Sequence, residues 1–279
     1  MIALTESSNP PIYIPTQDDL PSDDDDKMET SRHKYQMDLL LETIYPWLEK
    51  RQNGYAGGNM FIYFSLSQVK NKDYKGPDFF CVLDVEQKER KSWVVWEEGK
   101  APDVVIELLS DSTASYDKND KKSIYQNKMR VPEYFWYDPF TPDDWAGFSL
   151  VKGVYQPLKL DEFDRYISEQ LQLALVRWQG VYRGIDTIWL RWQTLEGDLL
   201  PTDKEISEVE KQRADEAQQL AEAEKQRAEE AQQLAEAEKK RAEEAQQLAE
   251  TEKQRAESAL SEIAKLKELL KNSGIEISD

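Results

Sequence analysis

Hydrophobic side chains recur at helical spacing early in the chain and predict a helix over residues 29–50. The apolar positions that would form its buried face are Met37, Leu40, Leu41, Ile44 and Leu48. Apolar runs typical of strands follow at 60–66, 79–85, 93–96 and 104–109. A second helix is predicted over 117–130 and a buried strand over 134–137. This order of helices and buried strands predicts an α/β fold.

The run 104–109 is nearly all apolar, as expected of a central strand that is covered on both faces. Glu107 interrupts it, and a carboxylate there is costly unless it is paired or bound to a metal. A structural ion pair with an arginine or lysine is the alternative to a functional role. Between 147 and 200, short aromatic runs broken by glycine predict added β-hairpins.

Composition divides the chain into three regions and a short tail. Residues 1–27 contain four prolines and an acidic run at 23–26, and their low apolar content predicts a disordered arm. All 8 tryptophans fall within 28–202, which predicts that this region is the folded α/β domain. Residues 203–272 contain a helical repeat, and 273–279 form the tail.

The repeat within 203–272 has a period of 14 residues, or two heptads, and predicts one long helix. Counting in sevens from Ala214 gives an unbroken apolar series to Leu270, whereas the second seam position alternates between Ala and Glu before Ala259 and Leu266. Such a seam buries little apolar surface. Two alternatives stay open: a weak coiled coil that forms a homodimer, and an isolated helix supported by side-chain ion pairs.

The charge balance excludes several classes of protein. The 279 residues include 55 acidic and 36 basic side chains, a net charge of -19, which excludes a uniform basic coat for nucleic acid. With 1 Cys and 1 His, neither a disulfide framework nor a Cys/His zinc site can form. No apolar run approaches the roughly 20 residues of a membrane span, so we expect a cytoplasmic protein. Any contact with nucleic acid would need a local basic patch, such as Lys118, Lys121, Lys122, Lys128 and Arg130.

Two carboxylates and a lysine could meet at one edge of the sheet. Asp78 opens one predicted strand, and Glu107 lies in another. If the next helix follows directly, three side chains share one of its faces: Asp117, Lys121 and Tyr125. Divalent hard cations prefer carboxylate oxygens, with water completing the shell. A nearby ammonium would complete a hydrolytic site that orients water and stabilises charge on a phosphate.

Several motifs occur in a specific order between about 28 and 200: Pro77-Asp78, Pro102-Asp103 through Glu107 to Ser110, Tyr116-Asp117 with Lys121 and Tyr125, and Val131-Pro132-Glu133 closed by Asp138-Pro139. With them the chain resembles the Uma-type restriction endonucleases, a family within the PD-(D/E)xK phosphodiesterase superfamily. The resemblance implies a restriction-endonuclease-like core, a mixed central sheet flanked by helices. It also implies cleavage of DNA with Mg²⁺, or Mn²⁺ as a substitute, held by Asp78 and Glu107.

One departure from the superfamily pattern concerns the lysine. The pattern Glu-x-Lys would place it at 109, where this chain has Leu109. The resemblance implies that the lysine has moved to the following helix and maps to Lys121. Lys122 is the competing choice, but one helical step turns it about 100° from the face of Asp117. Asp117 would orient Lys121, and Asp103 would form a turn or act as a secondary ligand.

Other reactive or aromatic side chains have simpler explanations. His33 is expected to pack or lie on the surface of the first helix, and Glu29 could approach the site only in the resembled fold. Cys81 in an apolar strand is expected to be a buried thiol. The tryptophans between 178 and 192 could stack on bases, although the core of a hairpin is their commoner use.

We therefore interpret the chain as a metal-dependent endonuclease that acts on DNA. One alternative is a non-catalytic module with the same fold that binds nucleic acid or protein, which the acidic charge favours because it repels phosphates. Another is a structural protein whose working part is the helix over 203–272.

Overall fold

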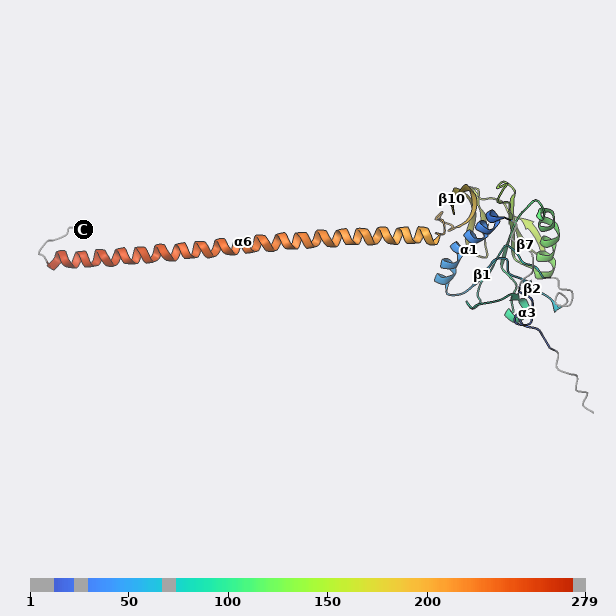
Figure 1. The fold of residues 1–279 in the computed structure, drawn as a ribbon, viewed down its shortest axis with the longest axis horizontal. Helices are drawn as coiled ribbons and strands as arrows, with labels where there is room; N and C mark the ends of the chain where they lie inside the picture. The colour runs from blue at the N-terminus through green and yellow to red at the C-terminus, as the bar shows by residue number, and fades with distance from the viewer. Residues whose placement is uncertain (1–12, 23–29, 67–73, 273–279) are drawn as a thin grey trace, which may run out of the picture. The chain divides into compact units, whose positions relative to one another are not determined.

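A computed structural model describes residues 13–22, 30–66 and 74–272, and divides the chain into two compact units after Ile206. The first unit is a mixed α/β domain, as the sequence predicts (Figure 1). Its six-stranded sheet has the order β1-β3-β5-β6-β7-β8. These strands are β1 (Tyr55–Gly57), β3 (Phe79–Val82), β5 (Val104–Leu108), β6 (Glu133–Tyr137), β7 (Trp145–Val151) and β8 (Val154–Pro157).

The pairing of β5 and β6 determines the layers of the domain. These two strands are parallel, whereas every other neighbouring pair in this sheet is antiparallel. A parallel pair needs a crossover, here a helical segment over 114–129. This segment consists of α4 (Ala114–Tyr116), η1 (Asp117–Lys121), α5 (Lys122–Ile124) and η2 (Tyr125–Met129), of which η1 and η2 are π-helical turns.

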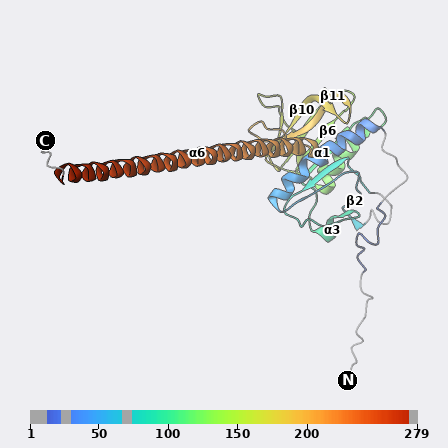
Figure 2. The same cartoon turned by 60° about the vertical axis from the view of Figure 1, so that its left-hand side comes forward.

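Alternating side chains of the strands divide the core between the two faces of the sheet. Val104 and Ile106 pack on the face covered by α1 (Ser31–Arg51), which lies across the sheet in Figure 2. Val105 packs on the opposite face, with Tyr125 and Met129 of the crossover. Because side chains in a strand alternate, Glu107 lies on the same face as Val105. The strand therefore directs this carboxylate toward the helical segment.

Smaller sheets complete the domain. The strands β9 (Tyr166–Ser168), β10 (Leu173–Tyr182) and β11 (Ile185–Gln193) form an antiparallel sheet, as expected of added hairpins. The strands β2 (Ile62–Tyr63) and β4 (Trp93–Val94) pair in parallel. Trp189 and Trp192 of β11 are fully buried, which fits the prediction that these tryptophans belong to a core.

Several local predictions differ from the structure, among them the run 60–66, which is a strand only at Ile62–Tyr63. The run 93–96 is a strand only at Trp93–Val94, because the chain then turns into the short helix α3 (Val95–Glu98), which ends at Gly99 with a left-handed φ of 74°. In the predicted arm, residues 13–22 contact the domain. Trp96 donates to the Pro15 carbonyl, Tyr63 donates to the Pro21 carbonyl, and Leu20 is buried. The remainder of 1–27 lies outside the described residues.

The helix α6 (Asp203–Asn272) contains the repeat as one continuous helix of 70 residues. Thr202 and Glu205 cap its start reciprocally, since each backbone N–H donates to the other's side chain. Buried Arg191 lies 2.8 Å from Glu205, which ties this first turn to β11. Side chains from 207 to 269 are exposed, so the coiled coil remains a prediction. Within the described chain, no helix is both long enough and apolar enough to cross a bilayer.

Candidate active site

The two predicted carboxylates lie at the same edge of the sheet. Glu107 is near the C-terminal end of β5, and Asp78 directly precedes β3, which runs antiparallel to β5. Asp78 Oδ2 accepts a hydrogen bond of 2.8 Å from the backbone N–H of Leu108. The two carboxyl groups interact electrostatically, since the charge of Asp78 raises the pKa of Glu107.

Both oxygens of Glu107 are occupied by donors from the crossover, and its side chain is fully buried. Lys121 Nζ donates to Oε2 at 3.0 Å, and the Tyr125 hydroxyl donates to Oε1 at 2.6 Å. A buried carboxylate is tolerated only where such partners replace its hydration.

Asp117 holds the lysine from the other side. Its Oδ1 lies 2.9 Å from Lys121 Nζ, and the Asp117 side chain is itself buried. Tyr134 of β6 donates to the Asp117 carbonyl at 2.9 Å and so attaches this turn to the sheet. The spacing of Asp117, Lys121 and Tyr125 therefore produces the single face that the sequence predicts, although the turns are π-helical rather than regular α-helix.

The two candidate lysines have different neighbours. Lys121 faces the carboxylates, whereas Lys122 Nζ lies 3.3 Å from the ring centroid of Phe148. Adjacent residues of a helix point about 100° apart, so the two ammonium groups reach different neighbours. Among the two, Lys121 is the residue that the structure brings to Glu107.

Burial changes the proton affinity of this cluster. Desolvation raises the pKa of Glu107 to about 8, against the lowering effect of the Lys121 ammonium, and Asp78 and Asp117 raise it further. Desolvation also raises the pKa of Asp78. Although its own burial opposes the change, the pKa of Lys121 is raised by the charges of Glu107, Asp117 and Asp78, which keeps its ammonium protonated. The single ammonium of Lys121 therefore does not balance the charges of the two carboxylates when both are ionised.

The donor set fits a divalent hard cation. Among the described residues, no group of three or more His, Cys, Asp or Glu side chains is arranged to enclose a metal. Mg²⁺ is usually held by one or two carboxylates while water and substrate phosphate complete its octahedral shell. Asp78 and Glu107 meet that requirement, since they are adjacent carboxyl groups whose charge is only partly balanced by one ammonium.

A family model described as "Uma2: Putative restriction endonuclease" matches residues 26–179. The chain belongs to the Uma2 family. This confirms the resemblance seen in the sequence, and the matched range includes both carboxylates and Lys121. A solved structure described as "a putative nuclease belonging to DUF820 from Anabaena variabilis ATCC 29413" is 14% identical, covering 52% of this chain and 76% of its own, with a TM-score of 0.38. A comparison with curated proteins finds no match.

Asp103 of this Uma2 chain lies away from the carboxylate pair. It comes just before β5, four residues from Glu107, and an extended strand of that length spans about 13 Å. Its Oδ2 accepts from the Leu83 N–H at 2.7 Å and lies 2.8 Å from Lys100 Nζ. Of the two predicted roles, the position supports the structural turn and contradicts a secondary ligand.

The expected basic patch is not a continuous cationic surface. Lys118 pairs with Asp144 at 2.6 Å, Lys121 faces Glu107, and Lys122 lies over Phe148. Lys128 and Arg130 are exposed. Lys118 and Lys121 are thus paired with carboxylates, and a contact of this patch with nucleic acid stays a prediction.

His33 is buried rather than on the surface, consistent with the packing role. Its Nε2 is 2.8 Å from the Leu109 carbonyl, and its Nδ1 is 2.9 Å from Thr30 Oγ1 at the helix N-cap. Cys81 is fully buried, as predicted, and burial raises the pKa of its thiol. Glu29 lies outside the described residues.

The spacing in the sequence places Tyr125 on the correct helical face but does not reveal its function. Its hydroxyl is the donor to Glu107 Oε1, and burial and the Glu107 charge raise its pKa, so it remains a donor. The signal was available, since a tyrosine one turn beyond Lys121 must face the same strand. The contact between Tyr134 and the Asp117 backbone had no such signal.

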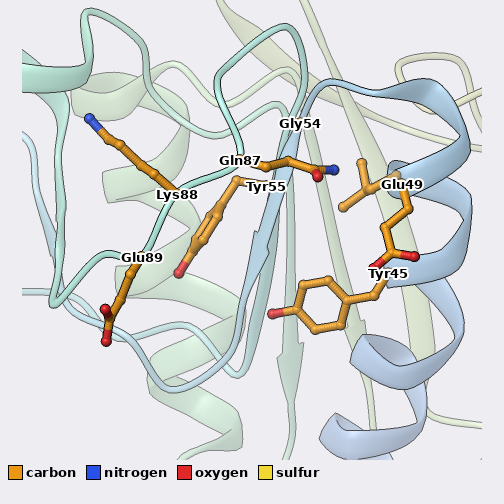
Figure 3. Close-up of a pocket in the computed structure, with 8 residues that line it drawn as sticks. Tyr45, Glu49, Gly54, Tyr55, Gln87, Lys88 and Glu89 are labelled. Atoms are coloured by element: carbon orange, nitrogen blue, oxygen red, sulfur yellow. The ribbon is translucent and has the colours of Figure 1, made fainter.

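A separate cavity of 330 Å³ lies beside α1 and β1 (Figure 3). It is lined by Tyr45, Leu48, Glu49, Gly54, Tyr55, Gln87, Lys88 and Glu89. Tyr55 pairs with Val82 at the far end of β3 from Asp78. This cavity is therefore not part of the carboxylate site.

Substitution of Tyr125 by Phe tests the support of Glu107. Removing the hydroxyl leaves Oε1 buried without its donor, so we expect the free energy of unfolding in EDTA to fall by about 2 kcal/mol, measured by urea titration. Tyr155→Phe is the matched control, since its buried hydroxyl donates to the Val131 carbonyl and not to a carboxylate. An equal loss of unfolding free energy in Tyr125→Phe and Tyr155→Phe would show that the hydrogen bond to Glu107 stabilises the fold no more than one to a backbone carbonyl.

The raised pKa of Glu107 predicts how stability depends on pH. Folded Glu107 keeps its proton up to about pH 8, whereas an unfolded glutamate releases it near 4.5. The folded state therefore binds more protons in this interval, and its stability falls as pH rises, by up to about 1.4 kcal/mol per pH unit for one proton. Urea unfolding in EDTA at pH 6 and pH 8 should show this fall in the wild type and a weaker fall in Glu107→Gln. An equal fall in stability in the wild type and in Glu107→Gln would contradict the assignment of this pH dependence to Glu107.

Proposed function

We propose that this protein is a metal-dependent endonuclease that hydrolyses phosphodiester bonds in DNA. The observation that carries the proposal is a fully buried glutamate in a central strand, with Lys121 at 3.0 Å and Asp78 at the same sheet edge, in a chain of the Uma2 family. A purely structural ion pair would need no second carboxylate beside it, and adding one is electrostatically unfavourable.

In this proposal Asp78 and Glu107 hold Mg²⁺, and Mn²⁺ could substitute. The bound ion would lower the pKa of a coordinated water and neutralise charge on the phosphate. Lys121 Nζ, held between Glu107 and Asp117, donates hydrogen bonds to the attacking water or to the charge that develops on the phosphate. Because both partners of Lys121 are fixed in buried positions, its ammonium is already oriented before substrate arrives.

A non-catalytic module that binds nucleic acid or protein is the alternative function. The observation in its favour is that Lys121 and Tyr125 donate to both Glu107 oxygens, which is how a purely structural carboxylate would be satisfied. The net charge of -19 opposes binding of a polyanion without a cation, and so favours protein over nucleic acid as the partner of such a module. The two functions differ in whether Glu107 is required for a chemical step.

Cleavage of supercoiled plasmid separates these functions. We expect nicking in Mg²⁺ or Mn²⁺ and none in EDTA, with the rate reduced at least about 100-fold in Glu107→Gln and in Lys121→Ala, because each removes a group that acts on the reacting phosphate. Lys122→Ala is the control, since this neighbouring lysine lies over Phe148 and not at the carboxylates.

Absence of nicking by folded wild-type protein in either metal would contradict the endonuclease proposal and favour the binding module. Equal activity in wild type and Glu107→Gln would contradict the assignment of the site while leaving a nuclease elsewhere in the chain.

We also propose that the C-terminal part of α6 pairs with a second copy of the chain. Ile263 and Leu266 occupy consecutive seam positions there and are exposed. We expect light scattering to show a dimer at micromolar concentration and a monomer for the double substitution Ile263→Asp and Leu266→Asp. Lys265→Asp, in the same turn but off the seam, should remain dimeric. A monomeric wild type would favour the isolated helix.

A further inference from the structure

An arginine side chain lies over an exposed aromatic ring beside the edge of the sheet that holds Asp78 and Glu107. Phe140 follows β6, and its side chain is 54% exposed. The guanidinium of Arg32 lies 4.4 Å from the centroid of this ring. In the part of the chain that the structure describes, Arg32 has no ion-pair partner.

A chain of contacts connects this pair to the proposed active site. Leu109 directly extends β5, two residues beyond Glu107, and its N–H donates to the Tyr137 carbonyl of β6. His33 lies 2.8 Å from the Leu109 carbonyl, and its ring centroid is 5.7 Å from that of Phe140. Phe140 and Arg32 therefore lie at the same edge of the sheet as the carboxylates.

The local backbone holds the ring in place. Asp138 Oδ1 accepts from the N–H groups of both Phe140 and Thr141, at 2.8 and 3.0 Å. Asp138 and Asp144 are joined by a further backbone hydrogen bond of 3.0 Å that closes the loop. Because the Phe140 side chain is 54% exposed, part of the ring is accessible to a ligand.

We propose that Arg32 and Phe140 bind the DNA strand next to the site of cleavage, with the guanidinium on a phosphate and the exposed part of the ring against a base. This combination of one cation and one aromatic ring is how proteins hold single-stranded nucleic acid, because phosphates need positive charge and every base has a face that can stack. The inference rests on the proposed DNA substrate. It also explains how a chain without a continuous basic patch could hold DNA close to two carboxylates.

Binding of a fluorescein-labelled single-stranded oligonucleotide in EDTA tests the pair without cleavage. Anisotropy titrations across a range of salt concentrations report both the affinity and its salt dependence. We expect Arg32→Ala to reduce the slope of log affinity against log salt by about 0.7, as loss of one phosphate contact to a single strand does. Phe140→Leu should weaken binding about tenfold and leave the slope unchanged.

The opposite end of α1 provides the matched controls. Arg51 lies 5.9 Å from the Trp47 ring there, so Arg51→Ala and Trp47→Leu remove the same kinds of group away from the carboxylates. Both controls should bind the oligonucleotide as the wild type does. Far-UV circular dichroism and urea unfolding of each variant will identify any that is simply less folded.

Two results would overturn the inference while the nuclease proposal stands. The first is wild-type affinity and salt slope in both Arg32→Ala and Phe140→Leu. The second is a loss of affinity in Arg51→Ala equal to that in Arg32→Ala, which would indicate a general charge effect. If folded wild-type protein binds no DNA at low salt and nicks no plasmid in Mg²⁺ or Mn²⁺, both the DNA substrate and this contact surface are wrong.

Discussion

The desolvation of Glu107 is the constraint on which this domain's site depends. A carboxylate in the fully buried central strand loses its hydration, and the loss must be offset by donors from the protein. Those donors, Lys121 and Tyr125, come from a single helical segment one turn apart. The position of that segment on the sheet therefore determines the geometry of the site.

The crossover between β5 and β6 keeps the segment in place. Because these strands are parallel, the chain must return over one face of the sheet, and the side of β5 that bears Glu107 is the face it covers. Apolar packing of Tyr125 and Met129 against Val105 holds the segment by its buried face. The hydroxyl of Tyr134 adds a directional contact at Asp117. Core packing and the site thus share residues, so a change in either affects the other.

The sequence predicts the parts of the site that follow from periodicity. An isolated carboxylate in an apolar run identified Glu107, and a spacing of four residues identified the face of Asp117, Lys121 and Tyr125. It could not exclude Asp103 as a ligand, because only the antiparallel pairing of β3 and β5 shows which end of β5 Asp78 meets. Nor could it show that Phe140 and Arg32 meet, since more than one hundred residues separate them. Contacts between distant segments depend on tertiary packing.

The balance of charge explains how an acidic protein could act on a polyanion. Asp78, Glu107 and Asp117 contribute three carboxyl groups and Lys121 one ammonium, so the fully ionised cluster has a net charge of -2. A phosphate entering it alone would meet repulsion, whereas a divalent cation would remove the excess. Cation and phosphodiester should therefore strengthen each other's binding, and this coupling is reciprocal. In that case a bound cation would strengthen DNA binding at the edge of the sheet that holds the carboxylates, and Arg32 would supply additional positive charge there.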